Sequence, residues 1–166
     1  MMDKCDSLGI SYNDNITELG ILQEDHNVNI VKNEIFNFNI PDGYIIEYGS
    51  WRGAVIDLLA KEYGEDRVFG FDISNFTNHP RIHKMDVRHL AGNKKYKLPI
   101  ALAWNDLSEW EGSPLGKQAA FDHALNNLVD NGIYMEMKNS PDYIRQHPNL
   151  HLFKETKYVS FFRFLS

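Results

Sequence analysis

The residues most able to do chemistry lie in segment 43–72. An apolar run ends near Glu47, and Gly49 and Gly53 follow within a short turn. A second apolar run ends on the carboxylate of Asp72. We expect a strand, a tight turn, a helix and a second strand, because glycine permits the sharp bend that such a turn needs. This order is typical of a nucleotide-type cofactor site in an open α/β sheet.

The chemistry of the turn favours one kind of cofactor. A dinucleotide-binding turn needs a middle glycine, because the backbone must approach the pyrophosphate closely. Here Trp51 takes that position, and Glu47 adds negative charge. Both features oppose a diphosphate and favour a ligand with cationic groups and no phosphate. S-Adenosylmethionine (SAM), with its ammonium and sulfonium groups, fits this description, and Asp72 is placed to accept hydrogen bonds from two ribose hydroxyls.

The pattern Glu-x-Gly-x-x-x-Gly at residues 47–53, followed by Asp72, resembles motifs I and II of the class I SAM-dependent methyltransferases. Its form, with a bulky residue between the glycines, is similar to the macrocin-type and related small-molecule O-methyltransferases. The resemblance covers residues 43–165 in the order of elements, and the specific motifs lie in its first third. The alternative is an ordinary strand–helix–strand unit whose glycines only make a turn.

The resemblance implies roles for residues that follow the strands. Ser50 and Trp51 would line the methionine end of the cofactor through backbone groups, with Arg52 beside them or paired with a surface acid. Asp86 and Val87 would meet the adenine, unless Asp86 only caps a turn. The implied cofactor-binding residues are Glu47, Gly49, Ser50, Trp51, Gly53, Asp72, Ile73, Asp86, Val87 and Asn105.

Two residues are candidates for catalysis. Asp106 follows the central strand, where the resemblance implies a position beside the sulfonium methyl group. Methyl transfer to an oxygen needs alignment of the acceptor and a base for its proton. His123 is the other candidate base, and a surface or packing role is its alternative. The segment 105–108 lacks the Pro-Pro-Tyr sequence of enzymes that methylate nucleic-acid amino groups, so we do not expect a flipped base as substrate.

A metal site is not expected. Asp106 and Glu136 could offer oxygen ligands to Mg²⁺, as in some macrocin-type relatives. The usual acidic pair after the fifth strand is missing, however, and Lys138 would repel a cation. Trp104 and Trp110 flank the segment that carries Asp106, and each could contact the acceptor or pack in the core.

Composition limits the remaining possibilities. The chain has 166 residues, which suits one domain, and a net charge of −6 opposes a general nucleic-acid surface. A single cysteine, the lack of a secretory signal and the lack of a long apolar run suggest a cytoplasmic protein. No membrane partner is expected.

The sequence predicts an N-terminal extension or lid at 1–40 and a Rossmann-like methyltransferase domain at 41–166. We expect an α/β sheet that is mostly parallel with its last strand antiparallel, in a minimal version with reduced helices. Residues 36–40 alternate as a short strand or an extended lid would. The expected strands are 44–48, 68–72, 81–85, 98–105, 133–137, 150–155 and 159–165, and the expected helices are 16–23, 53–63, 114–129 and 141–146.

The leading hypothesis is therefore a SAM-dependent methyltransferase that acts on a small-molecule acceptor, by O-methylation. The alternative is a non-catalytic methyltransferase-like module that binds SAM or a nucleoside. A nicotinamide-dependent reductase is disfavoured by Trp51. The aromatic C-terminal strands leave two possibilities open, a homodimer through that sheet edge or packing onto the chain's own core.

Overall fold

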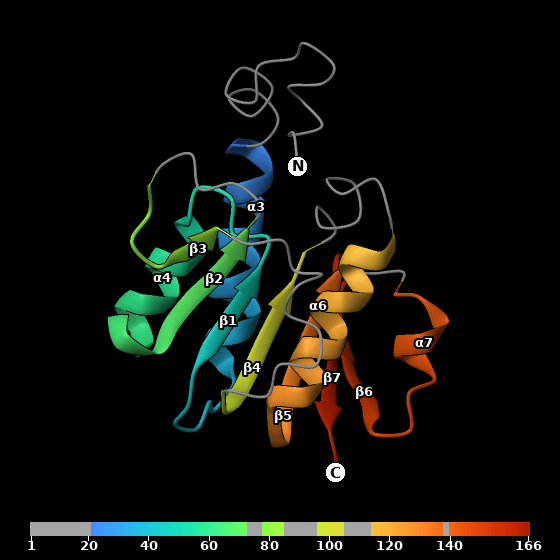
Figure 1. The fold of residues 1–166 in the computed structure, drawn as a ribbon. Coiled ribbons are helices and arrows are strands. Elements are labelled where there is room, and N and C mark those ends of the chain that lie inside the picture. Colours follow the sequence, from blue (N-terminus) through green and yellow to red (C-terminus); the bar gives the residue numbers. More distant parts are fainter. Residues whose placement is uncertain (1–20, 73–77, 85–95, 105–113, 138–139) are drawn as a thin grey trace.

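The computed structural model describes residues 21–72, 78–84, 96–104, 114–137 and 140–166. Its centre is a seven-stranded sheet in the order β3-β2-β1-β4-β5-β7-β6 (Figure 1). Neighbouring strands from β3 to β5 are parallel, and β7 is antiparallel to both of its neighbours. The expected mostly parallel sheet is thus confirmed. The strands are β1 (Ile45–Tyr48), β2 (Val68–Asp72), β3 (Ile82–Lys84), β4 (Leu98–Ala103), β5 (Leu128–Met137), β6 (Leu150–Glu155) and β7 (Val159–Phe164).

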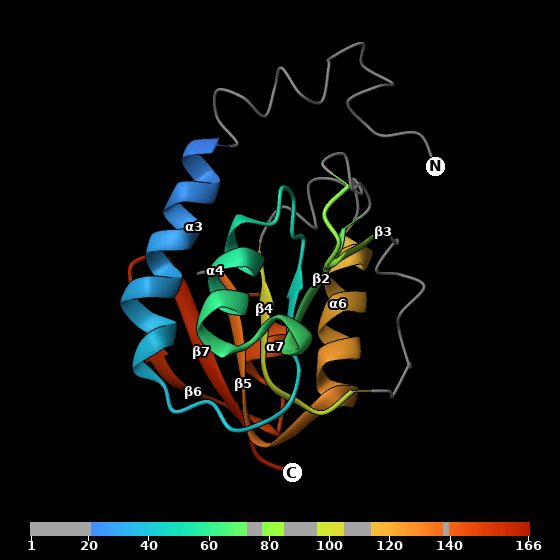
Figure 2. The same cartoon turned by 90° about the vertical axis from the view of Figure 1, so that its left-hand side faces the viewer.

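Helices cover both faces of this sheet. Figure 2 shows α3 (Ile21–Glu34) and α4 (Ala54–Tyr63) on one side and α6 (Pro114–Asn127) on the other. The chain steps from β1 to β2 in one direction along the sheet and from β4 to β5 in the opposite direction. Because parallel crossovers are right-handed, these two steps must place α4 and α6 on opposite faces. A short helix, α7 (Asp142–Arg145), precedes β6.

Strand β1 supplies side chains to both layers. Ile45 belongs to the core under α3 and α4, whereas Ile46 and Tyr48 belong to the core under α6. Successive residues of a strand point to opposite faces, so Glu47 shares the face of Ile45. All four residues of β1 are buried, because the strand lies in the middle of the sheet with a parallel neighbour on each side.

The N-terminal region differs from the expectation. The helix expected at 16–23 lies mostly outside the described residues, and α3 continues to Glu34. The strand alternative for residues 36–40 is wrong, because a 3₁₀ helix occupies Ile35–Asn37. Only a few apolar residues of α3 reach the core. Those residues are Ile30 and Val31, joined by Ile35 just beyond the helix.

The second half follows the expected order with shifted boundaries. Helix α6 ends at Asn127 and β5 begins at Leu128, five residues before the expected start of that strand. Leu98 pairs with Leu128 and Ile100 with Ile133, so the irregular pairing between them accommodates the extra residues. The terminal hairpin of β6 and β7 is confirmed, and its pairing has a bulge between Leu152 and Lys154. In the described segments, every helix is too short or too polar to cross a membrane.

Candidate functional site

The turn between β1 and α4 has an unusual backbone. Gly49 and Gly53 have φ angles of 79° and 90°, and Trp51, between them, has a φ of 52°. A bulky side chain in the left-handed region costs roughly 1–2 kcal/mol. The Gly49 amide donates to the carbonyl oxygen of Phe71 at 2.8 Å, which ties the turn to β2. The bend therefore lies where the sequence predicted it, and it includes a strained non-glycine residue.

Asp72 bonds directly to this turn. The backbone amide of Trp51 donates to Asp72 Oδ2 at 2.7 Å, and Asp72 is 8% exposed. The two predicted motifs, which lie in separate parts of the sequence, thus meet at the C-terminal ends of β1 and β2. Ligands of open α/β sheets bind at such strand ends. Ser50 is also part of this group, because its hydroxyl donates to the Glu47 carbonyl oxygen at 3.1 Å.

Glu47 is a buried carboxylate with one satisfied oxygen. It is 2% exposed, and its Oε2 accepts a hydrogen bond from the indole Nε1 of Trp104 at 2.6 Å. Its Oε1 is buried without a hydrogen-bond partner in the described part of the chain. Burial raises the pKa of the Glu47 carboxyl well above its usual range; the Trp104 bond and the nearby Ser50 hydroxyl oppose the shift, and the charges of Glu24 and Asp72 add to it. A buried carboxyl oxygen that lacks a hydrogen-bond partner, such as Oε1, is suited to a cationic hydrogen-bond donor.

A third carboxylate reaches the turn from α3. Glu24 is 5% exposed, and its Oε1 accepts from Arg52 Nε at 3.0 Å and from Arg52 Nη2 at 2.9 Å. Its Oε2 lies 3.5 Å from the amide nitrogen of Ala54, at the start of α4, where negative charge is favoured. Burial raises the pKa of Glu24, and the Arg52 guanidinium opposes that shift. Arg52 therefore pairs with a buried acid from α3 instead of a surface acid, and no residue spacing predicts this contact.

Gly53 lies close against a residue that precedes β3. A Cβ at this position would lie 2.5 Å from the ring of His79. His79 Nδ1 accepts from the Arg81 amide, so its Nε2 carries the proton and donates to Asp57 Oδ1 at 2.8 Å. This network joins the segment before β3 to the first turn of α4.

Gly70 also supports the turn, although it is not among the residues predicted from the sequence. It lies in β2 opposite Glu47, and a Cβ there would come within 1.7 Å of Ser50 Oγ. Glycine inside a strand often marks the close approach of another chain segment. The isolated glycine in the run Val68–Asp72 was the signal that could have revealed this packing.

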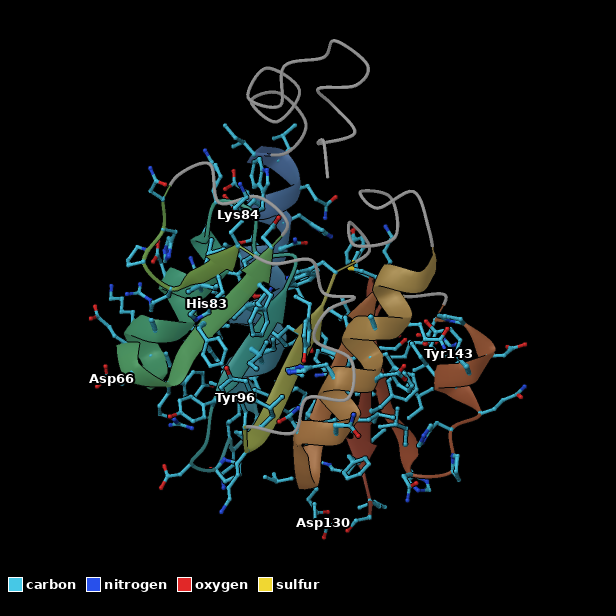
Figure 3. The ribbon with its side chains drawn as sticks, viewed as in Figure 1. Asp66, His83, Lys84, Tyr96, Asp130 and Tyr143 are labelled. Carbon is cyan, nitrogen blue, oxygen red and sulfur yellow. The ribbon has the colours of Figure 1, made fainter. Side chains whose placement is uncertain are left out.

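His123 is a residue of α6, and its side chain is buried in the core. It is 0% exposed, and its Nδ1 is 2.6 Å from the hydroxyl oxygen of Tyr48. The rings of Tyr48, Phe71 and Tyr96 surround it, and Figure 3 shows Tyr96 on the side of the sheet that carries α6. Burial lowers the pKa of His123 to about 4, so the imidazole is neutral at pH 7. This environment favours the packing alternative, and the role of His123 as a base stays a prediction.

The Tyr48–His123 pair predicts acid sensitivity. An unfolded histidine has a pKa near 6.5, and the folded value is about 4, so protons bind preferentially to the unfolded chain as the pH falls. Between pH 7 and pH 4 this residue should remove about 3 kcal/mol from the free energy of unfolding. Urea unfolding at several pH values should show that loss in the wild type and not in the Tyr48→Phe/His123→Leu double variant. His151→Gln, at an exposed position, is the control, and equal pH profiles for the wild type and the double variant would contradict the assignment.

Several predicted residues cannot be placed against this site. Ile73, Asp86, Val87, Asn105 and Asp106 lie outside the described residues, so their roles stay predictions. Glu136 is 0% exposed on β5 and pairs with Ala103 of β4. The described residues contain no group of three or more His, Cys, Asp or Glu side chains that could hold a metal ion.

The solved structures that resemble this arrangement include several methyltransferases. The N-methyltransferase NodS from Bradyrhizobium japonicum WM9 is 11% identical, with a TM-score of 0.57 over 87% of this chain and 97% of NodS. The magnesium protoporphyrin IX methyltransferase from Synechocystis PCC 6803, with bound SAM, is 15% identical, with a TM-score of 0.57 over 95% of this chain and 85% of that one. The MycE methyltransferase of the mycinamycin biosynthetic pathway, in complex with Mg and SAH, is 13% identical, with a TM-score of 0.55 over 84% of this chain and 47% of MycE.

No protein-family model and no curated protein matches the sequence. These structural likenesses nevertheless cover 84% to 95% of this chain. The chain therefore has the Rossmann-like fold of the class I SAM-dependent methyltransferases, as the motif resemblance implied.

Proposed function

We propose that the chain binds SAM at the turn between β1 and α4 and transfers its methyl group to a small-molecule acceptor. The observation that carries this proposal is the Oε1 of Glu47, which is buried without a hydrogen-bond partner among the described residues. Three carboxylates, from Glu24, Glu47 and Asp72, gather around one turn, and each is less than 9% exposed. Such a turn disfavours a phosphate and suits an ammonium group, so the residues fit this cofactor.

Asp72 is the proposed ribose contact. A carboxylate has about four lone-pair sites, so Asp72 can accept hydrogen bonds from ribose hydroxyls as well as from the Trp51 amide. The Trp51 bond also fixes the orientation of the carboxylate before a ligand arrives. Ser50, Trp51 and the two turn glycines are proposed to line the amino-acid end of the cofactor through their backbone groups.

Bound SAM would supply an activated methyl group, and the protein would align the acceptor and accept its proton. We assign the proton to Asp106, two residues beyond Trp104 at the end of β4. We propose an oxygen acceptor, whose proton the carboxylate base would remove, although NodS among the compared structures is an N-methyltransferase. A nucleic-acid acceptor is not proposed, because the chain has a net charge of −6. Mg²⁺ is not proposed either.

A calorimetric titration with S-adenosylhomocysteine (SAH) tests the cofactor assignment. We expect the wild type to bind SAH, and NAD⁺ to give no saturable heat. Asp72→Asn should weaken SAH binding by about 1–3 kcal/mol, because charge-assisted hydrogen bonds to the ribose are lost. Asp66→Asn is the matched control, since Asp66 is exposed and lies just before the opposite end of β2. Absence of SAH binding in the wild type would contradict the proposal.

The second candidate function is a non-catalytic module that binds SAM or a nucleoside. The burial of His123 favours it, because this leaves Asp106 as the sole remaining candidate base of the two predicted ones. Incubation with methyl-labelled SAM and a small-molecule extract separates the two functions. Labelled product indicates an enzyme, whereas tight SAH binding without any labelled product indicates a module.

A further inference from the structure

Trp104 connects the end of β4 to the charged turn after β1. Its side chain is 2% exposed and belongs to the core under α3 and α4. Ala103, the last residue of β4, pairs with Tyr48, so Trp104 follows β4 beside the carboxyl end of β1. From there, the indole N–H donates to Glu47 Oε2 at 2.6 Å. The sequence left open whether Trp104 contacts an acceptor or packs in the core, and the structure gives its N–H a carboxylate partner.

The guanidinium of Arg52, in the same turn, binds a different carboxylate, that of Glu24. Arg52 makes both of its described side-chain hydrogen bonds to Glu24 Oε1. The described hydrogen bonds of the Arg52 guanidinium therefore go to Glu24 and not to Glu47. One Glu47 oxygen is held by an indole, and the other is buried without a partner in the described segments.

We propose that Trp104 is a positioning residue for the cofactor, which holds Glu47 so that Oε1 can accept a hydrogen bond from the ammonium group of the ligand's amino-acid moiety. This inference rests on the proposed function. A glutamate side chain has several rotatable bonds, and fixing it before binding lowers the cost of association. Trp104 thus acts through Glu47 and makes no contact with the reacting atoms.

The test uses two ligands that differ only at the amino-acid end. SAH carries the ammonium group, and 5′-methylthioadenosine has the same nucleoside and sulfur without it. Trp104→Phe keeps an aromatic ring and removes the donor. We expect this variant to weaken SAH binding roughly tenfold, as for the loss of a hydrogen bond to a charged group. Binding of methylthioadenosine should change less than twofold.

A double-mutant cycle shows whether the effect passes through Glu47. In a Glu47→Gln background, Trp104→Phe should cause little further loss of SAH affinity. Tyr134→Phe is the control for a buried change, since Tyr134 belongs to the core on the opposite face of the sheet. Equal weakening of both ligands, or losses that simply add in the cycle, would overturn the role of Trp104. Failure of the wild type to bind SAH would instead overturn the proposed function, and this role with it.

A measurement on the wild type covers the case in which Trp104→Phe does not fold. The chain has three tryptophans, so an ¹⁵N-labelled sample should give three indole N–H signals. Conservative replacements of the other two tryptophans assign the Trp104 signal. That signal should shift when SAH binds and stay in place when methylthioadenosine binds. A Trp104 signal that responds equally to both ligands, or to neither, would contradict the proposal.

Discussion

Replacement of Gly70 by alanine is expected to lower the free energy of unfolding by about 3 kcal/mol, as severe overpacking does. The new Cβ would lie 1.7 Å from Ser50 Oγ, 2.4 Å from Ile56 Cδ1 and 2.8 Å from Ser50 Cβ. The two side-chain ends could rotate away, but the Ser50 Cβ cannot move without the turn. SAH affinity should therefore fall together with stability, and urea unfolding and calorimetry measure the two effects.

Two further variants isolate the steric cause. Gly64→Ala tests backbone strain without crowding, because Gly64 has a φ of 110° and a Cβ there would meet nothing within 4 Å. Its cost should be nearer to 1 kcal/mol. In a Ser50→Gly background, the loss caused by Gly70→Ala should shrink, because both close Ser50 atoms are gone. An undiminished loss in that background would show that Ser50 is not the obstacle.

Glu47→Gln is expected to have opposite effects on stability and on binding. Burial raises the pKa of Glu47, so its folded state favours the neutral acid. The contribution of the neutral Glu47 to stability is present at low pH. It is lost as the pH rises above the pKa of Glu47 in the unfolded chain towards its pKa in the folded protein. The wild type should thus lose stability relative to Glu47→Gln as the pH rises above 5, by at most about 1.4 kcal/mol for each pH unit.

Urea unfolding of the ligand-free proteins between pH 5 and pH 8 measures this difference. Glu65→Gln, at an exposed position, is the matched control and should follow the wild type. Saturating SAH should reverse the order, because the wild type gains the ammonium contact and the glutamine variant does not. Parallel pH profiles for the wild type and Glu47→Gln would show that Glu47 titrates as an ordinary exposed acid.

The sheet and the position of the turn could be predicted because they depend on local patterns. Alternating apolar runs and amphipathic segments gave the order of strands and helices, and Gly49 marked the bend at the end of β1. The boundary errors at α6 and β5 arose where Asn131, with a φ of 65°, lies inside a strand. A strand that continues through such a residue depends on its pairing partner, here β4, which local propensity does not report.

The partners of the site residues could not be predicted in the same way. The Glu24–Arg52 pair joins positions 28 residues apart, and the Trp104–Glu47 bond joins positions 57 apart. Neither contact has a spacing signal, because each depends on how α3 and β4 pack beside β1. His123 illustrates the same limit, since only the packing of α6 against Tyr48 showed that its ring is buried.

The alternation of side chains along β1 has a consequence for the acid–base behaviour of the ligand-free protein. Burial raises the pKa of Glu47 in one layer, and its neighbour Tyr48 bonds in the other layer to a histidine whose pKa burial lowers to about 4. Rising pH ionises the first group, and falling pH ionises the second, so each contributes one limit to the range of greatest conformational stability. Two consecutive residues of one buried strand, Glu47 and Tyr48, thereby set the alkaline and the acid limit of this pH range. A cationic ligand that contacts Glu47 would extend the range only towards higher pH.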